Sequence, residues 1–378
     1  MNSELSFEEV VYAYFECRKR KRHSAHQLEF EFDLEKNLFT LFEELLSGTY
    51  QIGRSIAFVV EQPKIREIWA ATFRDRVVHH LIYNRLKTRF YPSFINNSFA
   101  CIPNRGALFG SDKLMSGMRS ITQNWQRPAY YLSGDVRNFF VSIHKPTLFH
   151  LLEKKLYEPW LLELTRQVLF HDPKTNCFLK SKRQVFNRVP KYKSLWSHSK
   201  EQGLPIGNLT SQFFANVYLN ELDQYVKHTL KVKYYYRYVD DFVILHENSD
   251  FLNDCFYKIN SFLHERLFLE LHPFKKRLGL IDQGIDFVGF FHKPFRRYPR
   301  RRTAERAKSV VIQWKKGTRC FDFASLIQFR ATMNSYLGLL RQTSSYRLRK
   351  YLGDKVRCLF VWPNEKYTKF IILKLKRN

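Results

Sequence analysis

Two adjacent aspartates interrupt a run of aromatic and β-branched residues, and this feature constrains the chain more than any other. Asp240 and Asp241 lie within YYRYVDDFVIL, where Tyr, Val, Phe and Ile favour strands on both sides. An exposed hairpin turn would explain an isolated Asp-Asp pair. Here the flanking strands are hydrophobic, and two neighbouring buried carboxylates would lose hydration and repel each other, so a bound cation would stabilise them.

A third carboxylate, Asp135 in YLSGDVRNFF, stands at the end of another predicted strand. Oxygen ligands that converge from separate strands are what a Mg²⁺ site requires. Two Mg²⁺ ions held by the three aspartates would activate a primer 3′-hydroxyl and stabilise a pyrophosphate leaving group. The sequence therefore predicts two-metal nucleotidyl transfer, with Mn²⁺ as a substitute ion.

The charge balance points to a polyanionic partner. The 378 residues include 63 Lys and Arg against 35 Asp and Glu, which gives a net charge of +28. So many positive charges repel one another in a compact fold, and the phosphate backbone of a nucleic acid is the usual ligand that offsets this repulsion. Because 44% of the residues are hydrophobic and 16% aromatic, the chain can build a core, which excludes general disorder.

Several basic side chains are candidates for binding the triphosphate of an incoming nucleotide, because cationic side chains bind phosphate oxygens. They are Lys64, Arg66, Arg74 and Arg105. A solvated positive surface would also explain each one, and Arg105 is favoured because Pro103 and Gly106 place it on a turn. Phe140, five residues after the first aspartate, is a candidate for contact with the sugar 2′ position; core packing beside Phe139 explains it equally well.

The segment GLPIGNLTSQ forms a glycine-rich turn that leads into a predicted helix. In a polymerase, Gly207, Ser211 and Gln212 would contact the template base and the nascent pair, whereas a plain helix N-terminus would need only a polar cap. Later in the chain, Lys275 or Lys276 follows a predicted strand that ends at proline. A lysine there is a candidate to protonate the leaving pyrophosphate, and a surface charge is the alternative.

Hydrophobic spacing predicts an α+β fold. Apolar residues recur with helical period at 34–45, before Gly48, and from Asp75 to the Tyr91-Pro92 break. From residue 129 onward, short β-type runs alternate with helical segments, and a further amphipathic helix is predicted around 307–314. The segment 180–201 has seven Lys and Arg and little apolar period, which predicts a loop that contacts nucleic acid or a partner.

The spacing of the cysteines and the residues at the N-terminus indicate where in the cell the protein is located. The six cysteines form no C-x-x-C pairs, which predicts reduced thiols rather than a zinc or redox site. The N-terminus lacks the pattern of a secretory signal, and no apolar run is long enough to cross a bilayer. The sequence therefore predicts a cytoplasmic protein without membrane contact.

These motifs, in this order, resemble those of a reverse transcriptase. YVDD with its aromatic flanks resembles the family's central metal-binding motif, and SGDVRNFFVSI resembles the strand that holds its first catalytic aspartate. GLPIGNLTSQFFANVYLNELD resembles the motif that contacts template and nucleotide, and GIDFVGFF resembles the primer-grip strand. The resemblance covers roughly residues 30–350, which makes it more specific than any single motif.

Further details resemble the reverse transcriptases of diversity-generating retroelements. Group II intron enzymes are expected to show Q-G-x-x-x-S-P in the template-contacting motif, whereas this chain has IGNLTSQ, ending in Gln212. PKIREIWAATFRDRVVHHLIYNRL, SFACIPNRG and MNSYLGLLRQTSSYRLRKYL are also similar to that group, and the V-T-G element of retron enzymes does not occur. The resemblance implies an enzyme that copies a template RNA into cDNA with errors opposite adenines, so that the cDNA diversifies a target gene.

The resemblance also implies an architecture and a set of partners. The fold would be a right-hand polymerase, with N-terminal helices and fingers at 1–128, a ferredoxin-like palm at 129–150 and 206–295, an insertion with the basic loop at 151–205, and a basic helical thumb at 296–378. The partners would be the template RNA, its hybrid with cDNA, dNTPs, and a small basic helical accessory protein that forms a ring.

The implied site has three groups of residues. The catalytic and metal-binding residues are Asp135, Val136, Asp240, Asp241 and Lys275, of which Val136 is a metal contact only and Lys275 a catalytic residue only. The nucleotide-binding residues are Lys64, Arg66, Arg74, Arg105, Phe140 and Gln212. The template or primer contacts are Ile206, Gly207, Asn208, Ser211, Tyr238 and Gly289.

Two other functions stay open at this point. One is a bacterial reverse transcriptase of another system, such as antiviral defence. The other is a non-catalytic RNA-binding scaffold with a degenerate polymerase fold. The three aspartates argue against a scaffold, because a scaffold has no need to keep mutually repelling carboxylates.

Overall fold

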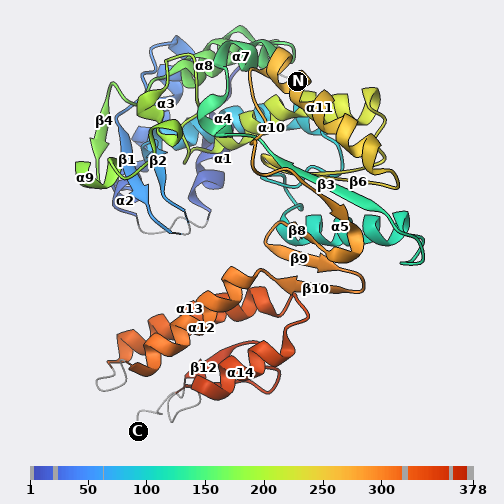
Figure 1. Ribbon diagram of the computed structural model, residues 1–378. Coiled ribbons are helices and arrows are strands. Elements are labelled where there is room, and N and C mark those ends of the chain that lie inside the picture. Colours follow the sequence, from blue (N-terminus) through green and yellow to red (C-terminus); the bar gives the residue numbers. More distant parts are fainter. Residues whose placement is uncertain (1–3, 20–23, 63, 317–321, 357–360, 373–378) are drawn as a thin grey trace. The chain divides into compact units, whose positions relative to one another are not determined.

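The computed structural model describes residues 4–19, 24–62, 64–316, 322–356 and 361–372 (Figure 1). It contains both helices and strands, which confirms the predicted α+β class. The chain divides into two compact units. The first contains Met1–Cys101, Gly134–Phe242 and Asn253–Lys276, and the second contains Ile102–Ser133, Val243–Leu252 and Arg277–Asn378.

Four helices open the first unit, and their boundaries follow from local capping. They are α1 (Phe7–Arg18), α2 (Ala25–Phe32), α3 (Leu34–Ser47) and α4 (Phe73–Phe90), followed by the 3₁₀ turn η1 (Tyr91–Ser93). Helix α3 ends where Gly48 adopts a left-handed conformation with φ of 72°, as its position in the sequence predicts. The sequence predicts that this helix starts at Asp75, but α4 starts earlier, at Phe73. The reason is that the Thr72 side chain caps the helix by accepting a hydrogen bond from Asp75 N.

Further helical segments belong to the first unit, and one of them, α10, is buried along most of its length. They are α6 (Phe139–Ser142), α7 (Lys145–Glu153), α8 (Pro159–Phe170), α10 (Leu209–Gln224) and the π-helical turn η4 (Tyr225–Thr229). Helix α11 (Ser249–Leu267) begins in the second unit and continues into the first. The sequence predicts α7, α10 and α11 as helices, and the structure confirms all three.

A four-stranded sheet in the order β5-β6-β3-β7 carries the three aspartates. Its strands are β3 (Tyr130–Asp135), β5 (Tyr234–Tyr238), β6 (Asp241–His246) and β7 (Arg277–Leu280). Strands β3 and β7 are antiparallel, with Leu132 opposite Leu278. A Cβ atom on Gly134 of β3 would lie 2.4 Å from Cζ of Phe242 on the neighbouring strand β6, so only glycine lets β3 and β6 approach so closely.

A smaller sheet in the first unit has the order β2-β1-β4. Its strands are β1 (Ser55–Val60), β2 (Arg66–Ala70) and β4 (Cys177–Leu179), with β1 antiparallel to β2 and parallel to β4. The predicted basic loop follows β4. It contains only short helical turns: α9 (Arg183–Phe186), η2 (Lys191–Lys193) and η3 (Leu195–Ser197).

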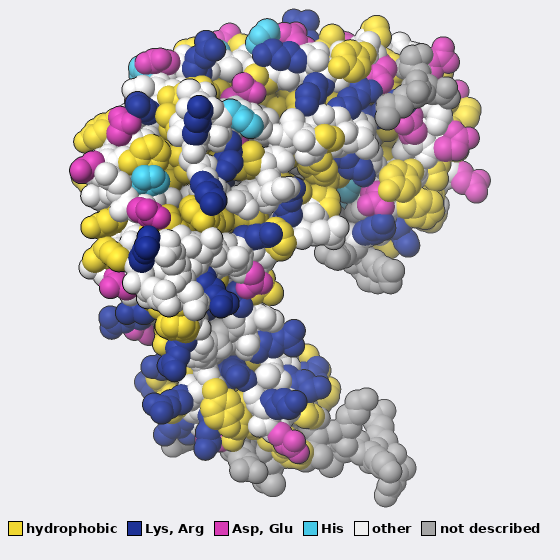
Figure 2. Space-filling model, turned by 90° about the vertical axis from the view of Figure 1, so that its right-hand side faces the viewer, with side chains coloured by type: hydrophobic (Ala, Val, Ile, Leu, Met, Phe, Trp, Pro, Cys, Tyr) yellow, Lys and Arg dark blue, Asp and Glu magenta, His cyan; other side chains and the backbone are white. Residues whose placement is uncertain are grey.

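The second unit combines helices with two small sheets. Its helices are α5 (Ala107–Ile121), α12 (Arg301–Lys316), α13 (Phe323–Leu340) and α14 (Tyr346–Val356), with the 3₁₀ turn η5 (Ile281–Gln283). The strands of these two sheets are β8 (Ile285–Phe287), β9 (Phe290–Lys293), β10 (Arg296–Pro299), β11 (Val361–Pro363) and β12 (Phe370–Ile372). Figure 2 shows many Lys and Arg side chains and few acidic ones over the C-terminal helices.

The C-terminal helices pack on their own apolar core. Ala307 and Val311 of α12 are buried there, and Val310 and Trp314 pack against the same core, as the predicted helical face requires. The segment predicted as a helical thumb also contains strands at both of its ends, β10 and the β11-β12 hairpin. None of the described helices has the length and apolar character needed to span a membrane.

Two predictions of strand were wrong in detail. The run at 129–140 is a strand only as far as Asp135, because Asn138 adopts a left-handed conformation with φ of 49° and starts the short helix α6. The run before Pro273 is not a strand, and only Leu271 forms an isolated bridge, to Val136. This single bridge still brings the lysine that follows it to the end of β3.

Candidate active site

The turn that carries Asp240 has an unusual backbone. Strand β5 ends at Tyr238 and β6 begins at Asp241, so Val239 and Asp240 form the turn. Val239 has a positive φ of 56°, which is a strained conformation for a β-branched residue. A residue in this state persists only where its surroundings hold it. The sequence predicts the hairpin correctly but does not predict the strained conformation.

A buried arginine holds this turn through a hydrogen bond to its backbone. Arg237 is 2% exposed, and its Nη1 donates a hydrogen bond to the carbonyl oxygen of Val239 at 2.9 Å. Its Nε and Nη2 donate to the two carboxylate oxygens of Asp223 on α10, at 2.7 and 2.6 Å. The Tyr235 hydroxyl donates to the same carboxylate at 2.9 Å. The arginine therefore joins the central helix to the aspartate turn through a fully buried ion pair.

Sequence analysis missed both members of this ion pair. The available signal was the arginine within YYYRYVDD, where a charged residue alternates onto the same strand face as a buried tyrosine. A buried arginine requires an acidic partner, but the sequence offers many acidic residues on helices and does not say which one packs here. Asp223 was therefore not identified as the partner.

The first aspartate lies at the end of β3, beside the turn. The amide of Val136, the next residue, donates a hydrogen bond to the carbonyl of Asp240 at 3.2 Å. The amide of His272 donates to the carbonyl of Asp135 at 2.8 Å, and Lys275 N donates to His272 O at 3.2 Å. As a result, the Lys275 ammonium contacts the Asp135 carboxylate.

The structure therefore brings all four predicted catalytic residues into one place: Asp135, Asp240, Asp241 and Lys275. The two lysine candidates separate clearly, because Lys276 instead donates to Asn253 at 2.8 Å and stacks over the ring of Phe256. Of the two, only Lys275 contacts an aspartate of the site. Its role as a proton donor stays a prediction.

The two aspartates of the pair, Asp240 and Asp241, have raised pKa values. Burial raises the pKa of Asp240 to about 6, and the charge of Asp135 contributes in the same direction, while Lys275 and Arg66 oppose the shift. As a residue, Asp241 is exposed to solvent at the start of β6. Burial is the largest cause that raises its pKa, to about 7, followed by the charge of Asp240 and a hydrogen bond with Asp135.

Within the described part of the chain, no group of three His, Cys, Asp or Glu side chains is arranged to hold a metal ion as it stands. The contacts of Asp135 explain why the three aspartates do not form such a group. Its carboxylate forms an ion pair with the Lys275 ammonium and also a hydrogen bond with Asp241. Positive charge from lysine thus lies where the sequence predicts positive charge from Mg²⁺. The predicted metal ligands, including Val136, stay predictions.

The predicted nucleotide-binding residues differ in their surroundings. Arg66 is exposed on β2, and its charge lowers the pKa of Asp240, so it lies within electrostatic range of the site. Lys64 is exposed just before that strand. Arg74 is engaged elsewhere: it forms an ion pair with Glu44 and stacks over the ring of Tyr50.

Phe140 and Arg105 occupy the local structures that the sequence suggests. Phe140 is half-buried in α6, its ring centroid lies 5.4 Å from that of Phe139, and its carbonyl accepts a hydrogen bond from Leu204 N at 2.8 Å. Both interpretations of its side chain, core packing and sugar contact, are compatible with this position. Arg105 lies on the predicted turn, in the second unit, and its amide donates to Ile102 O at 3.1 Å.

The glycine-rich turn before α10 is fixed to strand β2. Trp69 N donates to the carbonyl of Ile206 at 2.7 Å, and the Asn208 side chain accepts from Ala71 N at 3.0 Å. Gly207 has φ of 137°, and a Cβ atom there would lie 2.9 Å from Trp69 O. Only glycine therefore fits at this position, and hydrogen bonds hold the turn against β2.

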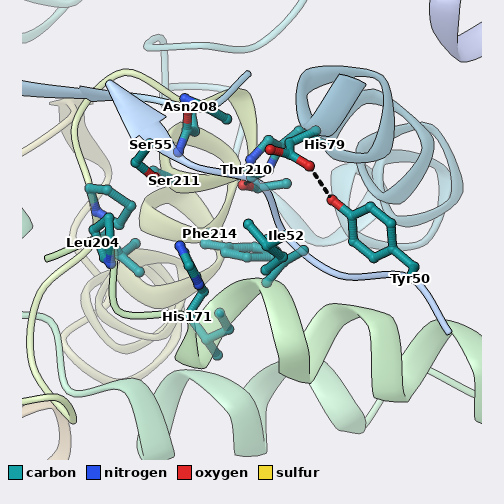
Figure 3. A pocket seen from close by; sticks show the side chains of 16 residues that line it. Tyr50, Ile52, Ser55, His79, His171, Leu204, Asn208, Thr210, Ser211 and Phe214 are labelled. Carbon is teal, nitrogen blue, oxygen red and sulfur yellow. Dashed lines mark hydrogen bonds between the residues drawn. The ribbon is translucent and has the colours of Figure 1, made fainter. Parts of the chain in front are cut away.

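This anchoring changes the roles expected for two side chains of the turn. Figure 3 shows Asn208, Thr210 and Ser211 around a small pocket behind the turn. The Thr210 hydroxyl forms a hydrogen bond with Nδ1 of His79 at 2.7 Å. The cavity is about 20 Å³, roughly the space of one water, and therefore cannot hold a nucleotide. Asn208 and Ser211 are buried, so they support the turn from inside, whereas Gln212 is exposed.

The last two predicted contacts lie on hairpins. Tyr238 is half-buried at the end of β5, next to the strained turn. Gly289 lies between β8 and β9 in the second unit, where it and Val288 both have positive φ, as a tight hairpin requires. A Cβ atom on Gly289 would meet nothing within 4 Å, so this turn has open space around it.

Comparison with known proteins identifies a family. The family described as reverse transcriptase (RNA-dependent DNA polymerase) matches residues 61–292, which is more than half of the chain and includes the whole aspartate site. The group II intron-encoded protein LtrA of Lactococcus lactis subsp. cremoris is 24% identical over 204 residues, which are 53% of this chain and 30% of LtrA. An uncharacterized 91 kDa protein in a cob intron of Schizosaccharomyces pombe is 26% identical over 185 residues, 49% of this chain and 20% of that protein.

Solved structures of telomerases are also similar in part. Apo telomerase of Candida tropicalis, truncated from its C-terminal domain, has a TM-score of 0.46 and 12% identity, and the match covers 66% of this chain and 55% of that one. Telomerase of Candida albicans with a fragment of telomeric RNA has the same score and identity, and the match covers 80% and 54%. The chain spans less than a third of the length of the curated relatives. Because the family match extends over more than half of the sequence, this chain belongs to the reverse transcriptase (RNA-dependent DNA polymerase) family.

Proposed function

We propose that the protein is an RNA-directed DNA polymerase that copies a template RNA into cDNA. One observation carries the proposal: Asp135, Asp240 and Asp241 lie together at adjoining strand ends, with the Lys275 ammonium beside them. Repulsion and lost hydration raise two of the three pKa values, which costs folding free energy. A purely structural turn has no use for carboxylates that destabilise the fold, whereas a phosphoryl-transfer site needs them to bind metal ions.

The three carboxylates fit divalent cations, which members of this family use. Their oxygens are hard ligands of the kind Mg²⁺ prefers, and burial together with the neighbouring carboxylates raises the pKa values of Asp240 and Asp241, so a bound cation would favour their ionised forms. Metal ions bound there would activate the primer 3′-hydroxyl and stabilise the leaving pyrophosphate. Lys275 is the candidate proton donor to that pyrophosphate, and Arg66 is the candidate phosphate ligand from β2.

A primer-extension assay tests the proposed activity. Purified protein is incubated with a primed RNA template, dNTPs and Mg²⁺, and the product is sequenced. We expect cDNA complementary to the RNA, and no extension of the primer without template. Salt-sensitive RNA binding without incorporation, under every divalent metal tried, would instead support the non-catalytic scaffold.

Mg²⁺ is expected to raise the melting temperature much more at about pH 8 than at about pH 5. Both raised pKa values, about 6 for Asp240 and about 7 for Asp241, lie above the ordinary aspartate value of 3.8. Protonation of these groups therefore stabilises the metal-free fold below about pH 4, and this stabilisation is lost as the pH rises to about 7. Mg²⁺ has to displace those protons at low pH but not at high pH.

Differential scanning fluorimetry with and without Mg²⁺ measures this effect. The double variant Asp240→Asn/Asp241→Asn is expected to lose the Mg²⁺-dependent shift at both pH values. Asp282→Asn, which removes an exposed aspartate in η5, serves as the matched control and is expected to keep it. An equal Mg²⁺-dependent shift at both pH values in the unmodified protein would contradict the assignment of these carboxylates as metal ligands.

We further propose that the enzyme serves a diversity-generating retroelement, with a small basic helical accessory protein as its partner in a bacterial or phage-infected cell. The support is the resemblance of the segment from Ile206 to Gln212. Sequenced cDNA is expected to carry substitutions concentrated at template adenines. A uniform low error rate, or untemplated repeats, would indicate a reverse transcriptase of another system, such as antiviral defence.

A further inference from the structure

The segment 180–201 covers one face of strand β2, and the aspartate site lies toward the other face. Along this strand Glu67 and Trp69 are buried, whereas Arg66 and Ile68 alternate with them. Ile68 approaches Gly207, and the charge of Arg66 reaches Asp240. Glu67 and Trp69 instead meet residues of the segment 180–201. Whatever binds to this segment therefore binds outside the aspartate site.

The fold of the segment is specified by a buried carboxylate. Glu67 is 4% exposed, and its carboxylate accepts hydrogen bonds from the Ser194 hydroxyl and from Leu195 N, the latter at 2.9 Å. The Trp196 ring packs against Trp69, with centroids 5.2 Å apart. The segment is thus a built structure whose side chains have defined positions, rather than a loose basic loop.

These contacts leave an open pocket of about 470 Å³ between α9 and η3. Its apolar part includes Leu179, Phe186 and Val189, and the Trp196 ring forms one wall. Arg183 and Lys191, both exposed, also line the pocket. The volume lies within the range of small-ligand sites, and the aromatic wall with adjacent cations suits a flat, partly polar ring attached to an anion.

The surroundings of the pocket are basic and aromatic. Residues 177–200 include seven Lys and Arg and no Asp or Glu. Exposed aromatic rings lie beside cations here: Lys193 lies over the ring of Tyr192, and Arg54, from the segment before β1, lies over the ring of Phe178. A positive surface with exposed aromatic rings is the pattern by which proteins bind single-stranded nucleic acid, with bases stacked and phosphates paired to cations.

We propose that this pocket binds one unpaired base of single-stranded RNA, stacked on Trp196, with the adjoining phosphates on Arg183 and Lys191. The identification of that RNA as the template strand ahead of the site of synthesis rests on the proposed function; the binding itself does not. A paired base cannot enter, because its partner strand fills the space beside the ring. The pocket therefore holds the template in its unpaired form.

Fluorescence anisotropy with a labelled unstructured RNA, without primer or dNTPs, tests the binding. Trp196→Ala is expected to weaken RNA binding about tenfold, and Trp196→Phe to retain most of it, since a ring remains for stacking. Arg183→Ala/Lys191→Ala is expected to weaken binding and to reduce the salt dependence of log Kd by a slope of about 1.4. The melting temperature of each variant shows that it is folded.

The control removes two positive charges elsewhere in the same unit. Lys36→Ala/Lys154→Ala changes two exposed lysines, on α3 and just after α7, and is expected to leave the affinity within about twofold. Equal losses in the two double variants would overturn the proposal, because charge alone would then explain binding. Unchanged affinity of folded Trp196→Ala would overturn it as well and would leave a protein partner as the alternative occupant.

Primer extension separates this proposal from the proposed polymerase function. On a primed template with a long unpaired RNA 5′ extension, the pocket variants are expected to lose product, and on a template with almost no extension they should match the unmodified protein. If the unmodified protein makes no cDNA, yet the pocket variants alone lose RNA affinity, the polymerase proposal fails and the pocket proposal stands. If the pocket variants extend the primer fully and keep their RNA affinity, the pocket proposal fails and the polymerase proposal stands.

Discussion

Replacing Asp240 or Asp241 by alanine is expected to reduce cDNA synthesis by about a hundredfold or more, since each change removes a proposed ligand of the metal ions that would stabilise negative charge in the transition state. The same changes should not destabilise the metal-free protein. Burial and mutual repulsion raise both pKa values, to about 6 and about 7, so each ionised carboxylate costs folding free energy. We therefore expect an inactive variant with an unchanged or higher melting temperature near neutral pH.

The combination of lost activity and retained stability is what distinguishes a catalytic carboxylate from a structural one. Primer extension measures the first property and thermal unfolding without Mg²⁺ measures the second. Asp250→Ala changes an exposed aspartate in the first turn of α11 and is the matched control, with activity and stability close to those of the unmodified protein. Undiminished synthesis by Asp240→Ala and Asp241→Ala would refute the assignment of the site.

The sequence predicts those parts of the fold whose signals are local. Helix α3 ends at Gly48, α4 runs to the break before Pro92, and β5 and β6 meet at the two aspartates, because helical period, turn residues and β-branched runs are properties of neighbouring residues. The convergence of Asp135 with the pair was predicted from its place at the end of another strand and from the oxygen ligands that a Mg²⁺ site requires. The contact of Lys275 with Asp135 then distinguishes it from Lys276, which the sequence left open.

The parts that the sequence did not predict depend on contacts between distant segments. Glu67 accepts hydrogen bonds from residues well over a hundred positions later in the chain, and nothing near it in the sequence indicates that partner. Asn208 and Ser211 have the polar character of template contacts, but the fold turns both inward. Spacing identifies which residue types lie in a turn, and only tertiary packing decides which of them face solvent.

Replacement of Arg237 is expected to have the second large effect, on stability and activity. This residue acts on the aspartate turn rather than on the substrate. Arg237→Met is expected to lower the free energy of unfolding by about 3–5 kcal/mol, because it leaves the Asp223 carboxylate buried without its partner. Asp223→Asn in addition removes that unpaired charge and keeps an acceptor for the Tyr235 hydroxyl. The double variant should therefore recover much of the lost stability, as measured by urea unfolding.

Activity is expected to behave differently from stability. In the double variant the carbonyl of Val239 still lacks the hydrogen bond from Arg237, so the strained turn that presents Asp240 is no longer held. We expect kcat in primer extension to stay at least about tenfold below that of the unmodified protein, because small displacements of reacting groups are costly. Recovery of stability without recovery of kcat identifies Arg237 as a positioning residue.

An ion pair elsewhere in the first unit provides the control for this separation. Arg89 on α4 donates to both carboxylate oxygens of Glu158 at the start of α8, and neither residue hydrogen-bonds the aspartate turn. Arg89→Met should also destabilise the protein, yet the folded fraction should keep its kcat. If the Arg237→Met/Asp223→Asn variant regains full kcat with its stability, the ion pair serves the core alone, and the strained valine turn holds its conformation without the arginine.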